Sequence, residues 1–156
     1  MIQLDEVKSS QDFQFAVALF REYADYIGID LSFQNFEEEL SSVQDQYVRP
    51  AGVLFLAYAN GDKLSGCFAI RKLEKEVCEL KRMYVRPAAR GLGVGKLMMK
   101  KGIETARALG YQKMRLDTLP SMKAAIHVYT KAGFYEIEPY RFNPIEGTRY
   151  FEIDLQ

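Results

Sequence analysis

The sequence feature that most constrains the fold is a glycine-rich stretch placed between a strand pattern and a helix pattern. Residues 77–85 read VCELKRMYV, a run typical of a β-strand, and residues 94–109 read VGKLMMKKGIETARAL, with apolar residues at helical spacing. Between them lies RGLGVGK, residues 90–96. A helix that begins in glycines leaves its first backbone amides free and directs a partial positive charge outward. The stretch therefore predicts an anion site at the start of this helix.

Two common nucleotide-binding motifs do not fit this stretch. A phosphate-binding P-loop requires GxxxxGK followed by Ser or Thr, but Gly91 is one position too close to Gly95, and Leu97 stands at the Ser/Thr position. A dinucleotide fingerprint requires GxGxxG early in a βαβ unit, whereas this chain has GxGxG after several strand patterns. Arg90 and Lys96 add donors suited to a pyrophosphate. A glycine-rich turn that only lets the helix dock is the simpler alternative.

The rest of the chain predicts an α/β organisation with hairpins. Alternating or continuous apolar runs predict strands at 1–7, 52–58, 63–73, 77–85, 113–119, 134–140 and 148–155. Apolar residues three and four positions apart predict helices at 9–28, 32–43, 94–109 and 122–132. Asn60-Gly61 marks a tight hairpin turn, and Ser9 or Ser10 can cap the first helix. Hairpins followed by a βαβ segment predict one domain over 1–156, with a mixed sheet flanked by helices.

The second predicted helix has one apolar face and one acidic face. Phe33, Phe36 and Leu40 lie three and four positions apart, so they share a face. Glu37, Glu38 and Glu39 follow one another in the same segment, and we expect them to form a solvated face.

Composition narrows the classes of function. The chain carries 21 basic and 21 acidic residues, which removes the broad positive charge of a general nucleic-acid binder. The N-terminus MIQLDEVKSSQDF contains acids and no long apolar run, so we expect no signal peptide, no membrane span and a cytoplasmic protein. Cys67, Cys78 and the lone His127 lack metal-ligand spacing. We therefore expect reduced packing cysteines and no metal site.

Three linked segments resemble the GNAT superfamily of acetyl-coenzyme A-dependent N-acetyltransferases. Arg90-x-x-Gly93-x-Gly95, between a strand and a long helix, matches the signature (Q/R)xxGx(G/A) of that family. Upstream, ELKRMYVRPAARG is similar to the family's fourth strand and exit loop, and downstream AAIHVYTKAGF is similar to its segment AixlYxkxGF. The resemblance implies a GNAT-like mixed, mainly antiparallel central sheet flanked by helices, in which the fourth and fifth strands splay apart.

The resemblance also implies that acetyl-CoA is the acyl donor and that two segments hold it. The residues whose backbone amides would bind the pyrophosphate are Arg90, Gly91, Leu92, Gly93, Val94, Gly95 and Lys96. Met83, Tyr84 and Val85 would offer backbone groups at a strand edge to the pantetheine arm. The family often has Asn seven residues before its tyrosine, where this chain has Met122. We expect Ser121 to cap that helix instead.

Acetyl transfer to an amine needs a neutral nucleophile, a stabilised oxyanion and a donor for the leaving thiolate. The resemblance places Tyr129 at the position of that donor, and a phenol is protonated at neutral pH. Its alternative role is that of a packing residue. The backbone amide of Met83 or Tyr84 is the expected oxyanion donor.

Glu79 lies eleven residues before Arg90, the offset of the general-base glutamate in the histone-acetylating branch of the family. Strand alternation puts Glu79 and Met83 on one face if no bulge intervenes. Glu79 is therefore a candidate general base or an anchor for an ammonium group. Its alternative is a structural pair with Lys81 or Arg82.

These residues predict direct acetyl transfer from acetyl-CoA to a primary amine, with a small molecule as acceptor and neither nucleic acid nor membrane as partner. Arg82 and Arg141 are candidates to bind a substrate carboxylate. Acetylation of a protein N-terminus or lysine is the enzymatic alternative, and it predicts an open groove in place of an enclosed pocket. A non-catalytic acyl-CoA-binding sensor module is the alternative of another class. Strand edges and aromatic surfaces are also compatible with a homodimer.

Overall fold

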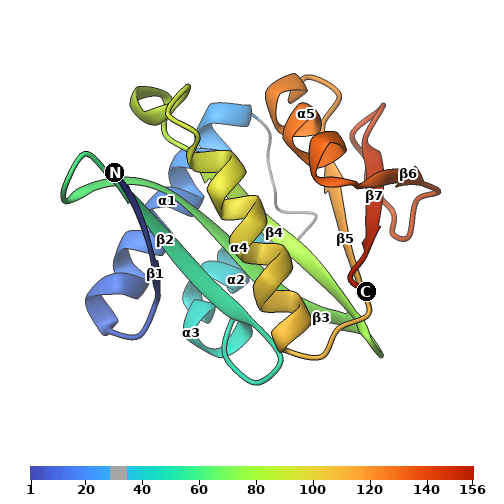
Figure 1. Cartoon of the computed structure of the whole chain (residues 1–156), viewed down its shortest axis with the longest axis horizontal. Helices are drawn as coiled ribbons and strands as arrows, with labels where there is room; N and C mark the ends of the chain where they lie inside the picture. The colour runs from blue at the N-terminus through green and yellow to red at the C-terminus, as the bar shows by residue number, and fades with distance from the viewer. Residues whose placement is uncertain (29–34) are drawn as a thin grey trace.

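The computed structural model describes residues 1–28 and 35–156, which form a seven-stranded sheet with helices on both faces (Figure 1). The strands follow the order β1-β2-β3-β4-β5-β7-β6 across the sheet. In this part of the chain β4 and β5 run parallel, while the other neighbouring strands are antiparallel. The mixed, mainly antiparallel sheet predicted from the sequence is confirmed.

The elements follow the predicted order, with two differences in length. The strands are β1 (Ile2–Glu6), β2 (Val53–Ala59), β3 (Lys63–Glu74), β4 (Val77–Val85), β5 (Lys113–Thr118), β6 (Tyr135–Ile137) and β7 (Arg149–Asp154). The helices are α1 (Ser10–Ile27), α2 (Phe36–Ser41), α3 (Val43–Gln46), α4 (Val94–Ala108) and α5 (Lys123–Ala132), with a 3-10 helix, η2, at Pro87–Ala89. The helix predicted at 32–43 is thus divided, and Phe33 lies outside the described residues. The strand predicted at 134–140 is short.

Local sequence chemistry explains where several elements begin and end. Ser9 caps α1, because its hydroxyl accepts from the Asp12 amide at 3.1 Å while the Asp12 carboxylate accepts from the Ser9 amide. Asn60 and Gly61 have φ values of 51° and 91°, which suit the tight turn between β2 and β3. The predicted first cap and first hairpin are therefore confirmed.

The start of α5 differs from the prediction. Met122 is the N-cap of this helix, and no side chain caps it. Ser121 contributes its backbone carbonyl, which accepts from the Lys123 amide at 2.9 Å. The predicted Ser121 cap is wrong, because the helix begins one residue too late for that hydroxyl to reach its free amides.

Two apolar layers hold the sheet between its helices. Helices α4 and α5 cover one face, and α1, α2 and α3 cover the other (Figure 1). The apolar residues that the sequence places at helical spacing in 94–109 face the sheet, with Val94, Met98 and Ala106 buried against it. Gly102 of α4 lies so close to Phe68 that an added Cβ would meet its ring at 3.4 Å. No helix in the described ranges has both the length and the apolar character of a membrane span.

Strands β4 and β5 pair over a short distance and then separate. Their register runs from Val77 opposite Lys113 to Glu79 opposite Arg115. Beyond that pair β4 continues to Val85, and β5 continues to Thr118, without mutual pairing. The predicted splay of the fourth and fifth strands is confirmed, and it leaves one edge of β4 open to a ligand.

A bulge in β4 changes which side chains share a face. Arg82 has a φ of 57°, and the pairing with β3 shifts between Lys81 and Tyr84. Met83 consequently packs on the α4 side of the sheet together with Leu80. Since Glu79 precedes Leu80, it points to the opposite face. Glu79 and Met83 were expected to share a face only if no bulge intervened; the bulge at Arg82 intervenes, and the two side chains lie on opposite faces.

Candidate active site

The glycine loop, residues 90–96, presents a row of free amides where α4 begins. Gly91 and Gly93 have φ values of 83° and 85°, a region that favours glycine, and a Cβ added at either would meet nothing within 4 Å. Within the described chain, the first helical bond of α4 runs from the Leu97 amide to the Gly93 carbonyl at 3.1 Å, and no side chain caps this end. The loop is therefore open and suited to an anion.

Arg90 is the predicted loop residue whose groups already have partners. Its backbone amide donates to the Pro87 carbonyl at 3.2 Å. Its guanidinium donates to the Val85 carbonyl at 3.2 Å and to the Tyr26 hydroxyl at 3.0 Å, and it lies 4.4 Å from the centre of the Tyr26 ring. Arg90 thus ties the loop to β4 and α1. Lys96 lies further along, in a groove between α4 and α5.

A pocket opens where β4 and β5 separate. Its walls come from α1, β4, β5, α5 and the segment before β7. The lining residues are Tyr23, Ile27, Leu80, Lys81, Arg82, Met83, Leu116, Asp117, Thr118, Leu119, Met122, Tyr129, Asn143, Ile145 and Thr148. Two predicted residues, Met83 and Tyr129, therefore meet in one site. Tyr84 instead points to the α1 side, where its hydroxyl donates to Glu22 at 3.0 Å.

Tyr129 lies on α5 and is 6% exposed. Its ring lies 5.9 Å from that of Phe134, centre to centre, so it contributes to packing as well as to the pocket. Burial raises the pKa of the Tyr129 phenol, and the neighbouring Tyr23 and Asp117 raise it further. The hydroxyl therefore keeps its proton at neutral pH and is suited to donate a hydrogen bond.

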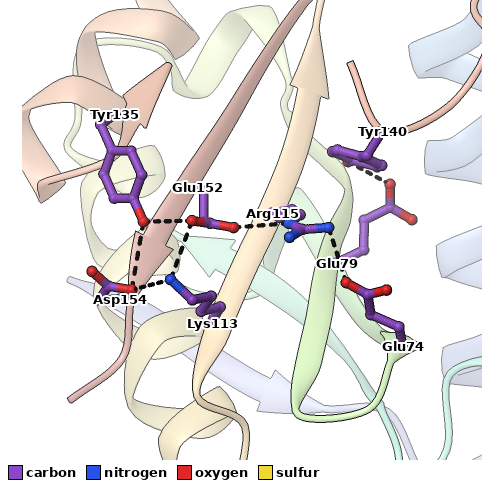
Figure 2. A network of polar contacts seen from close by, with 8 residues as sticks. All are labelled: Glu74, Glu79, Lys113, Arg115, Tyr135, Tyr140, Glu152 and Asp154. Atoms are coloured by element: carbon purple, nitrogen blue, oxygen red, sulfur yellow. Dashed lines mark hydrogen bonds and ion pairs between the residues drawn. The ribbon is translucent and has the colours of Figure 1, made fainter. Parts of the chain in front are cut away.

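Glu79 is fully buried at the last pair of β4 and β5. Its Oε1 accepts from Arg71 at 3.2 Å, and its Oε2 accepts from the Tyr140 hydroxyl at 2.8 Å (Figure 2) and from Arg141. Burial opposes its charge, but the charges of Lys81, Arg141 and Arg71 outweigh this and hold the pKa of Glu79 below its ordinary value. Glu79 is thus an ionised carboxylate with both oxygens occupied.

A network of charged side chains extends from Arg115, the β5 residue opposite Glu79, to β7. Arg115 donates to Glu152 at 2.8 Å and to Glu74 at 3.1 Å (Figure 2). Glu152 also accepts from Lys113 at 3.4 Å and from the Tyr135 hydroxyl. These pairs hold together the end of the sheet at which β4 and β5 are joined, so the opening lies at the other end.

Arg82 and Glu39 form a buried ion pair beneath the sheet. Arg82 Nε and Nη2 donate to the two carboxylate oxygens at 2.9 and 2.7 Å, and both side chains are 4% exposed. The Tyr47 hydroxyl donates to the same carboxylate at 2.8 Å. The predicted solvated position of Glu39 is therefore wrong. Because Arg82 is held by Glu39 and Arg141 by Glu79, neither predicted arginine is free here to bind a substrate carboxylate.

Two further ionisable residues line the pocket, Lys81, which the sequence suggested only as a partner of Glu79, and Asp117, which it did not indicate. Lys81 is 6% exposed, and burial together with the charge of Arg82 lowers its pKa to about 7. Asp117 follows Leu116 at the free end of β5. The sequence pattern KMRLDTL could have indicated Asp117, because strand alternation puts this carboxylate on the face opposite the apolar Met114 and Leu116.

Comparison with known proteins agrees with this geometry. The family model described as acetyltransferase (GNAT) family matches residues 16–134. An uncharacterized N-acetyltransferase of Schizosaccharomyces pombe is 37% identical over 155 residues, which cover 99% of this chain and 95% of that relative. A crystal structure of a GNAT-family acetyltransferase from Staphylococcus aureus has a TM-score of 0.82 at 22% identity and covers 100% of both chains.

A second solved structure has a similar fold. It is a putative acetyltransferase from Salmonella typhimurium with its cofactor acetyl-CoA, with a TM-score of 0.73 at 14% identity, covering 99% of this chain and 94% of that one. The two structures agree with the fold, while the family model and the Schizosaccharomyces pombe relative match the sequence itself. The chain belongs to the GNAT family of acetyltransferases.

Proposed function

We propose that this protein transfers an acetyl group from acetyl-CoA directly to a primary amine of a small molecule. The observation that carries this proposal is the pocket at the open end of β4 and β5, which brings Met83 and Tyr129 together beyond the glycine loop. An N-acetyltransferase needs such a place, because amine and thioester must meet there away from water.

The residues present fit acetyl-CoA at both segments that the sequence indicated. The free amides that follow Arg90 suit the pyrophosphate, since no side chain caps α4. The β4 edge from Met83 to Val85 has no β5 partner, so its backbone groups, apart from the Val85 carbonyl that accepts from Arg90, suit the amides of a pantetheine arm. The Salmonella typhimurium protein of similar fold, which is described with acetyl-CoA, supports this choice of donor. When bound, acetyl-CoA supplies an acetyl thioester whose carbonyl carbon is open to attack by an amine.

The chain's own residues would then act at two atoms of the reacting groups. A backbone amide of Met83 or Tyr84 would stabilise the oxyanion. The Tyr129 hydroxyl, protonated and buried, would donate a hydrogen bond to the leaving sulfur. Both oxygens of Glu79 already accept hydrogen bonds, so its surroundings favour neither the predicted base nor the predicted ammonium anchor; they favour a structural role that holds Tyr140 and Arg141 at the closed end of the splay.

The shape of the pocket favours a small acceptor. Tyr23 and Ile27 of α1 face it from one side, and Asn143, Ile145 and Thr148 face it from the segment before β7. A protein lysine or N-terminus would need an open groove at this place. Such walls instead suit a compact amine.

A charge placed in the glycine loop tests the cofactor site. We expect Gly95→Asp to weaken acetyl-CoA binding by on the order of 100-fold, since a like charge about 5 Å from the pyrophosphate costs roughly 3 kcal/mol at an effective dielectric of about 20. The variant should fold, because a Cβ at Gly95 meets Val85 and Val128 at ordinary contacts of 3.9 and 4.0 Å, and an acidic residue stabilises a helix N-terminus. Calorimetric titration with acetyl-CoA measures the effect.

Gly95→Ala is the matched control, because the family signature accepts alanine at this position. It should bind acetyl-CoA within about threefold of the wild type, a difference of well under 1 kcal/mol. Equal affinities of the Asp and Ala variants would place the pyrophosphate elsewhere. Absence of binding by the wild type would remove acetyl-CoA as the donor.

A further inference from the structure

Asp117 has an unusual position among the ionisable residues of the pocket. It lies two residues beyond Arg115, the last residue of β5 that pairs with β4, so its carboxylate stands where the strands have begun to separate. In the described part of the chain, its Oδ2 is the buried side-chain oxygen or nitrogen atom that lacks a hydrogen-bond partner. A buried carboxylate oxygen without a donor is costly, and at the wall of a pocket a catalytic role is one explanation for it.

A proton acceptor needs a lone pair that no hydrogen-bond donor occupies, and Glu79 differs from Asp117 in this respect. Both oxygens of Glu79 already accept hydrogen bonds, from Arg71 on one side and from Tyr140 and Arg141 on the other. An incoming ammonium group would have to displace one of these donors before it reached a lone pair. Asp117 offers a lone pair with no such competition.

The surroundings of Asp117 also raise its pKa, which makes its carboxylate more basic. Burial raises the pKa of Asp117, and the charge of Glu79 raises it further, while nearby cations oppose the shift. The charged and titratable groups around it are Glu79, Lys81 and Arg82 on β4, Arg141 in the β6–β7 loop, Tyr23 on α1, Tyr129 on α5, Tyr150 on β7 and Tyr140 in the same loop as Arg141. A carboxylate with a raised pKa is a stronger base at neutral pH.

We propose that Asp117 is the catalytic residue that receives the proton of the acceptor's ammonium group. Proton transfer to Oδ2 frees the lone pair on nitrogen, which then forms a bond to the acetyl carbonyl carbon. The carbon–sulfur bond breaks with its electron pair on sulfur, and the second proton lost by nitrogen ends on that sulfur. The products are the amide, the thiol of coenzyme A and one proton, which Asp117 returns to water. Tyr129 lines the same pocket and donates to the sulfur.

A pair of amines that differ in acidity and little in size tests this role. Ethylamine is almost wholly protonated at neutral pH, whereas 2,2,2-trifluoroethylamine is largely neutral and needs no base to free its lone pair. We expect Asp117→Asn to lower kcat/KM for ethylamine by about 100-fold or more and for trifluoroethylamine by less than about tenfold. Asp154→Asn, the same substitution at the exposed end of β7, should change neither value.

The variant Glu79→Gln distinguishes the role of Glu79 from that of Asp117. Because Glu79 holds Tyr140 and Arg141 in place, its loss should slow both amines by similar factors and leave their ratio unchanged. A ratio that changes in Glu79→Gln and not in Asp117→Asn would assign the base to Glu79 and overturn the proposal.

A measurement on the unmodified protein does not depend on turnover. The carboxyl carbon of Asp117, identified in the ¹³C NMR spectrum by its absence in Asp117→Asn, should titrate above the ordinary range of aspartate and shift when ethylammonium chloride is added. An ordinary titration with no response to ethylammonium would overturn the role of Asp117. Because this role rests on the proposed acetyl transfer, acetyl-CoA calorimetry is run alongside: failure there rejects the proposed function, whereas binding with an unresponsive Asp117 rejects the residue alone.

Discussion

Glu39→Gln is expected to lower the free energy of unfolding by about 3 kcal/mol, because it leaves the Arg82 guanidinium buried without a counter-charge. Both side chains of the pair are buried, and the Tyr47 hydroxyl donates a hydrogen bond to the same carboxylate. Urea denaturation at neutral pH measures the loss. Burial opposes the charge of Glu39, but the hydrogen bond and charge of Arg82 outweigh it and lower the pKa of Glu39 from its ordinary 4.5.

The sign of the pH dependence follows from that lowered pKa. The stabilisation by Glu39 is fully present above pH 4.5, the ordinary value, and is lost as the pH falls through the lower folded value. The difference between wild type and Glu39→Gln should therefore shrink in acid. Glu37→Gln is the matched control on the same helix, since Glu37 pairs with Arg21 in solvent and should cost at most about 1 kcal/mol. Equal losses in the two variants would contradict a buried pair.

Tyr129→Phe is expected to lower kcat by about 100-fold while acetyl-CoA affinity stays within about twofold. The phenylalanine ring preserves the contact with Phe134, so the change removes only the hydroxyl that is proposed to donate to the leaving sulfur. Steady-state release of the coenzyme A thiol gives kcat, and calorimetry gives the affinity.

Tyr135→Phe is the control for that substitution. Tyr135 lies on the edge strand β6, beyond β7, and its hydroxyl donates to Glu152, which does not line the pocket, so kcat should not change. A Tyr129→Phe enzyme with wild-type kcat would leave Tyr129 as a packing residue, the alternative that the sequence left open.

Local sequence patterns predicted the parts of the fold that depend on local chemistry. The glycine loop, the Asn60-Gly61 hairpin and the Ser9 cap each involve residues within a few positions of one another, and all three are present in the structure. The GNAT-like resemblance supplied a longer-range feature, the splay of β4 and β5, and it assigned to acetyl-CoA both Met83 and Tyr129, which line one pocket in the structure.

The errors and omissions share a different physical origin, in contacts between distant segments. Glu39 looked solvated because its partner Arg82 lies 43 positions away. The bulge was invisible because Arg82 is not a residue type that favours positive φ. Asp117 looked like an ordinary polar residue of a strand, since its unpaired oxygen exists only because β5 departs from β4. Three-dimensional context therefore identified the carboxylate of the candidate site that is free to act.

The most direct test of the central claim is acetyl transfer by the wild-type protein to a panel of small primary amines and, in parallel, to a lysine-containing peptide. Thiol release and mass spectrometry of the products report the reaction. We predict an N-acetylated small amine, formed much faster than any acetylated peptide. Tight binding of acetyl-CoA with no product from any acceptor would contradict this account and favour a non-catalytic binding module, and acetylation of the peptide alone would contradict the small-molecule acceptor.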